Sequence, residues 1–229
     1  MIAVIGDIHG CFYTLKKLVT KIKKEYPNSD IYSLGDLVDR GNFSAEVIEF
    51  VKDEGIVFTA GNHDLMFYYF FTDPPNPIGV PWIYNGNENT IRSYEKNPAL
   101  LDSHLDIIGN APLYINLDYH FISHAGISEM YLSHFKDSEF FLSDSFDLLI
   151  RATLAEPYSI IWNRAELIKL EKTQIVGHTR FEDVIFNKRS NSIYIDTSID
   201  TGNKLTAVII DGEELVNIIS VPTVAKDLE

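Results

Sequence analysis

The chain has 229 residues, 45% of them hydrophobic, which is enough to bury one sizeable core, and its formal net charge is −14. That acidity argues against a nucleic-acid polymer as partner, because binding to a phosphate backbone normally needs a Lys and Arg stripe, and none appears. No apolar run approaches the roughly 20 residues of a membrane span, and no secretory signal is expected. Cys11 is the single cysteine, which excludes internal disulfides and indicates a cytoplasmic location.

The first third of the chain alternates strands and helices. Apolar runs and amphipathic spacing predict, in order, strand 2–6, helix 12–26, strand 30–34, helix 44–54, strand 56–60 and helix 63–71. Ser44 is the expected N-cap of the second helix. This βαβαβ order implies parallel strands joined by right-handed crossovers. Their carboxyl ends are where open α/β sheets bind ligands.

The rest of the chain combines two insertions with further strands. Residues 72–112 are rich in Pro and Asn and then fit short helices, whereas 128–172 fit a mostly helical, aromatic segment. Strands are expected at 113–117, 119–123, 174–177, 183–187, 192–196, 204–210 and 214–220, with Asp211-Gly212 as a hairpin turn. The pattern predicts an α/β fold of two mixed sheets flanked by helices, in a single domain 1–229.

Five of the predicted strands end in short polar motifs. These are Gly6-Asp7-Ile8-His9-Gly10, Gly35-Asp36-Leu37-Val38-Asp39-Arg40-Gly41, Gly61-Asn62-His63-Asp64, Ser123-His124-Ala125-Gly126 and Gly177-His178-Thr179. One Asp or His at a strand end is more often a turn or capping residue, but the whole set indicates a metal centre. Its oxygen and nitrogen donors, without a thiolate, suit Mn²⁺, Fe or catalytic Zn²⁺. The candidate ligands are Asp7, His9, Asp36, Asn62, His124 and His178. Six ligands suit two ions that share Asp36, an arrangement that enzymes use for displacement at phosphorus.

Together these motifs resemble the calcineurin-like metallophosphoesterases, and more narrowly the phosphoprotein phosphatase family that includes the bacteriophage lambda phosphatase. Ile161-Trp162-Asn163-Arg164 and Tyr194-Ile195-Asp196-Thr197 extend the similarity, which runs from about Ile2 to Thr206. The resemblance implies a four-layer αββα sandwich. It also implies one metal ion on Asp7, His9 and Asp36, and a second on Asp36, Asn62, His124 and His178.

The resemblance further implies how a phosphate ester would be hydrolysed. A hydroxide bridging the two ions would be the nucleophile, and His63 would protonate the leaving oxygen. Asp39 would orient the His63 ring, and a neighbouring carboxylate favours a protonated imidazole. Arg40 and Arg164 would hold the phosphoryl oxygens, because guanidinium groups match phosphate geometry.

Several of these residues could instead have purely structural roles. Asp39 could be a helix cap, and Arg40 could pair with a surface acid. Trp162 is expected to pack in the core beside Arg164 rather than stack on substrate, and Asp196 is a candidate hydrogen-bond acceptor for His178. The histidines outside the motifs, at positions 104, 120 and 134, fit surface or core positions.

The motifs depart from the phosphoprotein phosphatase pattern next to His63. That pattern has Arg before Gly-Asn-His and Glu after it, whereas this chain has Ala60 and Asp64. One phosphate-binding guanidinium is therefore missing, and Arg180 either replaces it or is a surface strand residue. The Asp64 variant and His124-Ala125-Gly126-Ile127 are more similar to bacterial symmetrical diadenosine tetraphosphatases.

We expect a metal-dependent hydrolase of phosphate monoesters, foremost a serine/threonine-type protein phosphatase. Its substrate would be a phosphorylated protein or a small phosphoester, and its cofactor two divalent ions, Mn²⁺ ahead of Fe or Zn. The alternative is a diadenosine tetraphosphate hydrolase. A non-catalytic metal-binding scaffold is a third reading, disfavoured by the intact ligand set. The sequence leaves the oligomeric state open.

Overall fold

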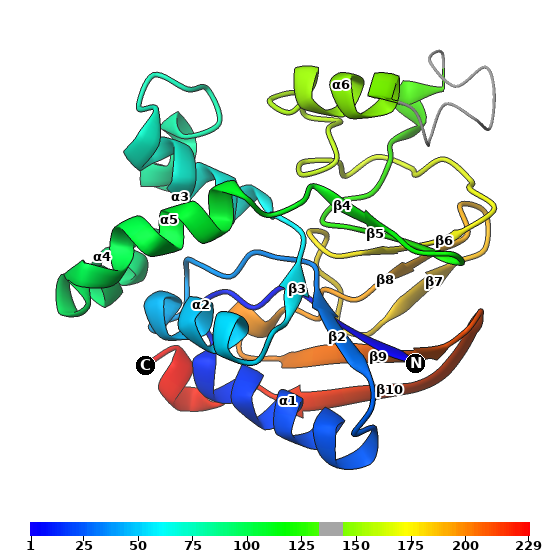
Figure 1. Cartoon of the computed structure of the whole chain (residues 1–229), viewed down its shortest axis with the longest axis horizontal. Coiled ribbons are helices and arrows are strands. Elements are labelled where there is room, and N and C mark those ends of the chain that lie inside the picture. Colours follow the sequence, from blue (N-terminus) through cyan, green and yellow to red (C-terminus); the bar gives the residue numbers. More distant parts are fainter. Residues whose placement is uncertain (133–143) are drawn as a thin grey trace.

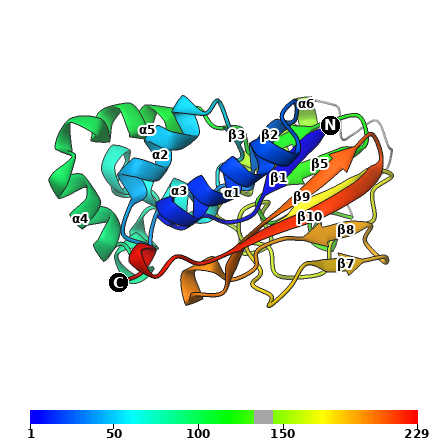
Figure 2. The same ribbon diagram turned by 90° about the horizontal axis from the view of Figure 1, so that it is seen from below.

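The computed structural model describes residues 1–132 and 144–229 (Figure 1). It has two mixed five-stranded sheets stacked face to face and flanked by helices, which confirms the predicted fold class. Helix α1 (Phe12–Glu25) packs on the outer face of the first sheet (Figure 2), and α6 (Asp144–Ala152) lies over the second. The expectation of a single domain with insertions stays a prediction.

Each sheet combines parallel and antiparallel strands. The first has the order β10-β9-β1-β2-β3, with β1 (Ile2–Ile5), β2 (Asp30–Ser33), β3 (Val57–Phe58), β9 (Lys204–Asp211) and β10 (Glu214–Pro222). The second has the order β4-β5-β6-β8-β7, with β4 (Tyr114–Asn116), β5 (His120–Ser123), β6 (Thr173–Val176), β7 (Ile185–Asn187) and β8 (Ser192–Tyr194). β1, β2 and β3 run parallel, as do β5, β6 and β8, so each group ends at one edge.

The remaining helices follow the predicted order. They are α2 (Ser44–Asp53), α3 (Asn62–Thr72), α4 (Glu88–Lys96) and α5 (Leu101–Gly109), with short 3₁₀ helices η1 (Val80–Tyr84), η2 (Pro98–Leu100), η3 (Glu129–Tyr131), η5 (Ile199–Thr201) and η6 (Ala225–Asp227). Residues 72–112 therefore do form short helices. None of the helices in the described parts of the chain combines the length and apolarity that crossing a bilayer requires.

The burial of β1 explains why its sequence is apolar throughout. Val4 points between the two sheets, where it joins a cluster with Ile122 and Ile175 of the second sheet. Ala3 and Ile5 point the other way, into the core under the helices. A strand covered on both faces needs apolar residues at every position rather than at alternate ones. The central position of β1 holds its carboxyl end, and the residues that follow, in the middle of the molecule.

Two expectations about local structure are wrong. Ser44 is the first residue of α2 rather than its N-cap, which is Phe43, and the Ser44 hydroxyl lies 2.9 Å from Thr90 Oγ1 instead. Residues 128–172 are not mostly helical: in the described part of that segment only η3 and α6 are helices. The rest of its described part forms turns and loops, which bond locally, as Ser159 N does to Glu156 O, and to the chain after β5, as Ile168 N does to Ile127 O. Residues 133–143, with the histidine at 134, lie outside the described residues.

Candidate active site

The ends of strands from both sheets converge on one narrow pocket of about 60 Å³. Its lining contains every site residue predicted from the sequence except Asp39 and His124, which are buried beside it, and it also contains Asn85 and Trp162. The predicted metal-ligand and phosphate-binding residues, which are up to 173 positions apart in the chain from Asp7 to Arg180, are therefore brought together.

Asp36 lies between two imidazoles in the geometry of a bridging ligand. Its Oδ2 is 3.5 Å from Nε2 of His9 and 3.6 Å from Nε2 of His124. Nδ1 of His9 donates to Val38 O, and Nδ1 of His124 donates to Leu34 O. Because a carbonyl oxygen only accepts, each ring carries its proton on Nδ1 and leaves Nε2 free for a cation. These backbone contacts therefore orient both rings so that Nε2 faces Asp36.

The donor set fits a divalent cation. Ligand atoms of Asp7, Asp36 and His124 all lie within 4.8 Å of one another, and Asn62 Oδ1 lies 2.9 Å from His124 Nε2. Asp7 Oδ1 is buried and has no hydrogen-bond partner among residues 1–132 and 144–229. Burial, then the charges of Asp196 and Asp36, raise the pKa of Asp7 well above its ordinary value. A buried, unpaired carboxylate oxygen next to other carboxylates is stabilised by a cation.

Several site residues have unusual backbone conformations. The φ angles of His9, Asp36, Asp39, Arg40 and His178 are all positive, between 46° and 71°. Non-glycine residues adopt this left-handed region at a cost, and such strain concentrates at functional sites. The neighbouring glycines have a different role: a side chain at position 61 would collide with Asp36, and one at position 177 with Asp7. The strand ends can approach closely only because these positions lack a side chain.

His178 is positioned by backbone contacts on two sides. Its backbone N–H donates to Asp7 Oδ2 at 3.0 Å, and its ring Nε2 lies 3.2 Å from the carbonyl oxygen of Trp162. The expected partner, Asp196, accepts from Ser198 N instead. Nε2 of His178 therefore carries the proton, which leaves Nδ1 as its free nitrogen.

Asp39 and His63 form a buried pair. His63 Nδ1 donates to Asp39 Oδ2 at 2.7 Å, and the exposed fraction of both side chains is 2% or less. Asp39 also accepts from Trp82 Nε1 at 3.0 Å and from Thr90 Oγ1 at 2.8 Å. Burial raises the pKa of Asp39 even though these three partners act against it. Its carboxylate thus orients the His63 ring and does not cap α2.

Trp82 and Thr90 come from η1 and α4, within the segment expected to be an insertion. Nothing in the spacing of the sequence marks either as a partner of Asp39. The segment supports the site directly: without it, Asp39 would be a buried carboxylate with a single hydrogen-bonding side chain. Such a group is unfavourable in a protein interior.

Arg40 points into the pocket rather than to the surface. Its Nη1 lies 2.7 Å from His9 Nε2, and its Nη2 lies 2.9 Å from His63 Nε2. Its acidic partner is Asp200, at 3.3 Å, which is 6% exposed and therefore not a surface acid. With Arg40 beside it, burial lowers the pKa of His9 well below its ordinary value.

Two more guanidinium groups reach the same pocket. Arg180 Nη2 lies 2.7 Å from Asp200 Oδ2, and Arg164 Nη1 donates to the His178 carbonyl oxygen at 3.1 Å. Arg180 therefore lines the site and is not an isolated surface residue. Sequence reasoning missed Asp200, although it follows closely on the Tyr194-Ile195-Asp196-Thr197 motif, which was the only available signal.

Asp64 is one of the two departures from the phosphatase pattern. Its carboxylate links the loop after β2 to the loop after β3. Its Oδ1 accepts from Leu37 N at 2.8 Å and its Oδ2 from Gly61 N at 3.0 Å. Burial, and then the charge of Asp36, raise the pKa of Asp64 to about 8. The other departure, Ala60, is fully buried.

Residues 1–196 match the sequence profile of the calcineurin-like phosphoesterases. The chain belongs to this family. Two curated relatives are named bis(5'-nucleosyl)-tetraphosphatase PrpE [asymmetrical]. The one from Oceanobacillus iheyensis is 30% identical, and the match covers 96% of this chain and 92% of that protein. The one from Bacillus cereus strain Q1 is 27% identical, and the match covers 94% of this chain and 92% of that protein.

Solved structures share the fold of this calcineurin-like phosphoesterase. One, described as a candidate diadenosine tetraphosphatase, has a TM-score of 0.63 at 18% identity and covers 98% of this chain and 94% of that one. A cold-active protein-tyrosine phosphatase of Shewanella sp. has a TM-score of 0.61 at 18% identity, covering 97% and 80%. The chain is thus a metallophosphoesterase, a hydrolase family that uses divalent metal ions and phosphoester substrates.

Proposed function

We propose that this chain hydrolyses bis(5'-nucleosyl) tetraphosphates. The observation that carries the proposal is the pocket in which Arg40, Arg164 and Arg180 surround the candidate metal ligands. Three guanidinium groups suit a chain of phosphates, which carries charge on every phosphate rather than only at its end. The names of the curated relatives support the same substrate class.

We propose that two divalent ions, Mn²⁺ foremost, bind in this pocket. Asp7, His9 and Asp36 would hold one, and Asp36, Asn62, His124 and His178 the other. Bound there, the ions would activate water and neutralise charge on the phosphate under attack. The unpartnered Asp7 Oδ1 and the two imidazoles facing Asp36 support this assignment.

The other side chains would then bind the substrate and transfer a proton. The Nε2 atom of His63 faces the pocket, because Nδ1 is bound to Asp39, and it would donate to the oxygen of the leaving group. Arg40, Arg164 and Arg180 would orient the phosphates by charge-assisted hydrogen bonds. We place the reaction in the cytoplasm, which the single, buried Cys11 supports.

An activity panel tests the proposal. The enzyme would be supplied with Mn²⁺ and assayed on diadenosine tetraphosphate, a phosphoserine peptide, a phosphotyrosine peptide and p-nitrophenyl phosphate. We expect the highest kcat/KM for the tetraphosphate. A kcat/KM for either phosphopeptide equal to or above that value would contradict the proposal and restore the protein phosphatase reading.

A further inference from the structure

A second pocket adjoins the candidate active site, and no metal ligand lines it. Its volume is about 480 Å³, within the range of roughly 300–1,000 Å³ typical of small-molecule sites. Its walls are formed by Pro77, Ile78 and Pro81 on one segment and by Ala155, Pro157, Trp162 and Arg164 on another. Among the described residues of this lining, Arg164 is the only charged one. The pocket therefore offers flat apolar surfaces with a single cation at its edge.

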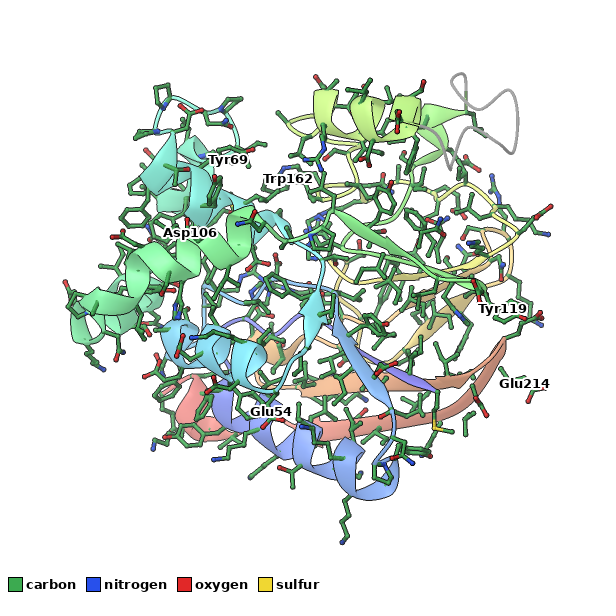
Figure 3. The ribbon with its side chains drawn as sticks, viewed as in Figure 1. Glu54, Tyr69, Asp106, Tyr119, Trp162 and Glu214 are labelled. Carbon is green, nitrogen blue, oxygen red and sulfur yellow. The ribbon has the colours of Figure 1, made fainter. Side chains whose placement is uncertain are left out.

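Trp162 and Arg164 belong to both pockets. The indole of Trp162 is half-buried, and its ring centroid lies 6.1 Å from that of His178, with the two rings nearly perpendicular. Trp162 lies between the α3–α5 helices and the region of α6 (Figure 3). A substrate whose phosphate lies at the candidate metal site would thus extend along Trp162 into the apolar pocket. Trp162 packs against the main core, as expected, and its half-buried indole also lines the two pockets.

We infer that the apolar pocket binds the nucleobase of the nucleoside whose phosphate is attacked. This inference rests on the proposed function and adds the position of the substrate. A purine or pyrimidine base stacks on aromatic side chains through its face, whatever its ring substituents. The three prolines lack N–H donors, so their walls do not read the edge of a base. We therefore expect similar affinity for adenine and guanine dinucleotides.

The position of the pocket and the asymmetrical cleavage named for the curated relatives indicate the same bond. Because Trp162 and Arg164 line both pockets, a base held in the apolar pocket would be separated from a phosphorus at the candidate metal ligands by little more than its ribose. That phosphorus is then the one esterified to the ribose. The oxygen of water bonds to it, the bond to the next bridging oxygen breaks, and that oxygen leaves with the electron pair. The products are a nucleoside monophosphate and a nucleoside triphosphate.

A binding experiment tests the pocket without turnover. The chain has two tryptophans, and the other, Trp82, is fully buried. We expect adenosine 5'-monophosphate to quench the tryptophan fluorescence of the Mn²⁺-loaded protein and ribose 5-phosphate to leave it unchanged. In Trp162→Phe the quenching should disappear. Equal responses to the two ligands, or quenching that persists in Trp162→Phe, would overturn the inference.

A kinetic experiment complements it with matched variants. Ala155→Tyr places a bulky side chain at an exposed position on the pocket wall, and Leu148→Tyr places the same side chain on α6 at a residue that is 68% exposed and outside the lining. The ratio of kcat/KM for diadenosine tetraphosphate to that for p-nitrophenyl phosphate should fall about tenfold or more in Ala155→Tyr. It should stay at the wild-type value in Leu148→Tyr. An unchanged ratio in Ala155→Tyr would contradict the binding of the nucleobase in this pocket.

Product analysis separates this inference from the proposed function. Adenosine monophosphate and triphosphate in equal amounts support the assigned position of the base, whereas two molecules of adenosine diphosphate would overturn it and leave the proposed function intact. If the wild-type enzyme does not cleave the tetraphosphate, the proposed function fails. The quenching by adenosine monophosphate then still decides whether the pocket binds a base.

Discussion

Asp200 Oδ2 lies 2.7 Å from Nη2 of Arg180, and the same oxygen lies 3.3 Å from Arg40 Nη1. One carboxylate, 6% exposed, thus fixes two guanidinium groups that come from distant parts of the chain. Arg180 is held at the candidate active-site pocket, although Ala60 stands where the phosphoprotein phosphatase pattern has an arginine. With Arg180 held by Asp200, the pocket contains three guanidinium groups, those of Arg40, Arg164 and Arg180.

Asp200→Asn should weaken substrate binding through both arginines. Hydrogen bonds to charged groups contribute about 1.5–3 kcal/mol, so kcat/KM for diadenosine tetraphosphate should fall roughly ten- to a hundredfold. The matched control is Asp183→Asn, because Asp183 pairs with Lys204 at the surface and is 74% exposed. Steady-state kinetics of both variants check this. Equal activity in the two variants would contradict the role of Asp200.

Arg180→Ala should reduce kcat/KM about as much as Arg164→Ala, since both side chains line the same pocket. Each loses a charge-assisted contact, with an expected loss of roughly ten- to a hundredfold. Arg189→Ala is the control, because Arg189 is 73% exposed and pairs with Glu129. A wild-type kcat/KM in Arg180→Ala, together with a reduced kcat/KM in Arg164→Ala, would contradict a role of Arg180 in the site.

His63→Asn should keep the fold and most of the metal binding, because His63 is assigned as proton donor and not as ligand. General acid catalysis contributes roughly 10²–10⁴-fold. The loss of kcat should be largest for phosphoserine, whose alkoxide leaving group needs the proton. It should be smaller for p-nitrophenyl phosphate, which has a good leaving group. Circular dichroism and the bound-metal content check the fold, and equal losses on both substrates would argue against the acid role.

Asp36→Asn should lower both activity and metal content, since Asp36 lies between the two candidate sites. We expect EDTA to abolish activity in the wild type and Mn²⁺ to restore it. Elemental analysis of the dialysed proteins should show less bound metal in Asp36→Asn than in wild type. Full activity of metal-stripped enzyme would rule out the proposed centre.

Two histidines away from the pocket should make stability depend on pH. Burial lowers the pKa of His104 and of His120 below the ordinary value of 6.5. The unfolded chain therefore takes up protons first as the pH falls through 6.5, so the free energy of unfolding decreases toward acidic pH. In His120→Leu this decrease between pH 7.5 and 5.5 should be smaller. Urea unfolding at both pH values measures it, and an identical pH dependence in the variant would contradict the assignment.

The chemistry of the centre was readable from the sequence because each ligand motif is local. Asp7, Asp36, Asn62, His124 and His178 each follow an apolar run that becomes a strand, and parallel strands bring their carboxyl ends to one edge. The flanking glycines mark where strand ends approach closely, as position 61 does against Asp36. The fold class followed from the same alternation.

Contacts between distant segments were decided only by the tertiary structure. The indole N–H of Trp82 reaches Asp39 across 43 positions, Asp200 joins Arg40 to Arg180, and Pro77 and Trp162 line the same apolar pocket. No spacing rule links such residues, because their meeting depends on how the segments between them pack. The segment after β5 shows the same limit: besides η3 and α6, its described part forms turns, and part of it bonds to the loop after β5, as Ile168 N does to Ile127 O.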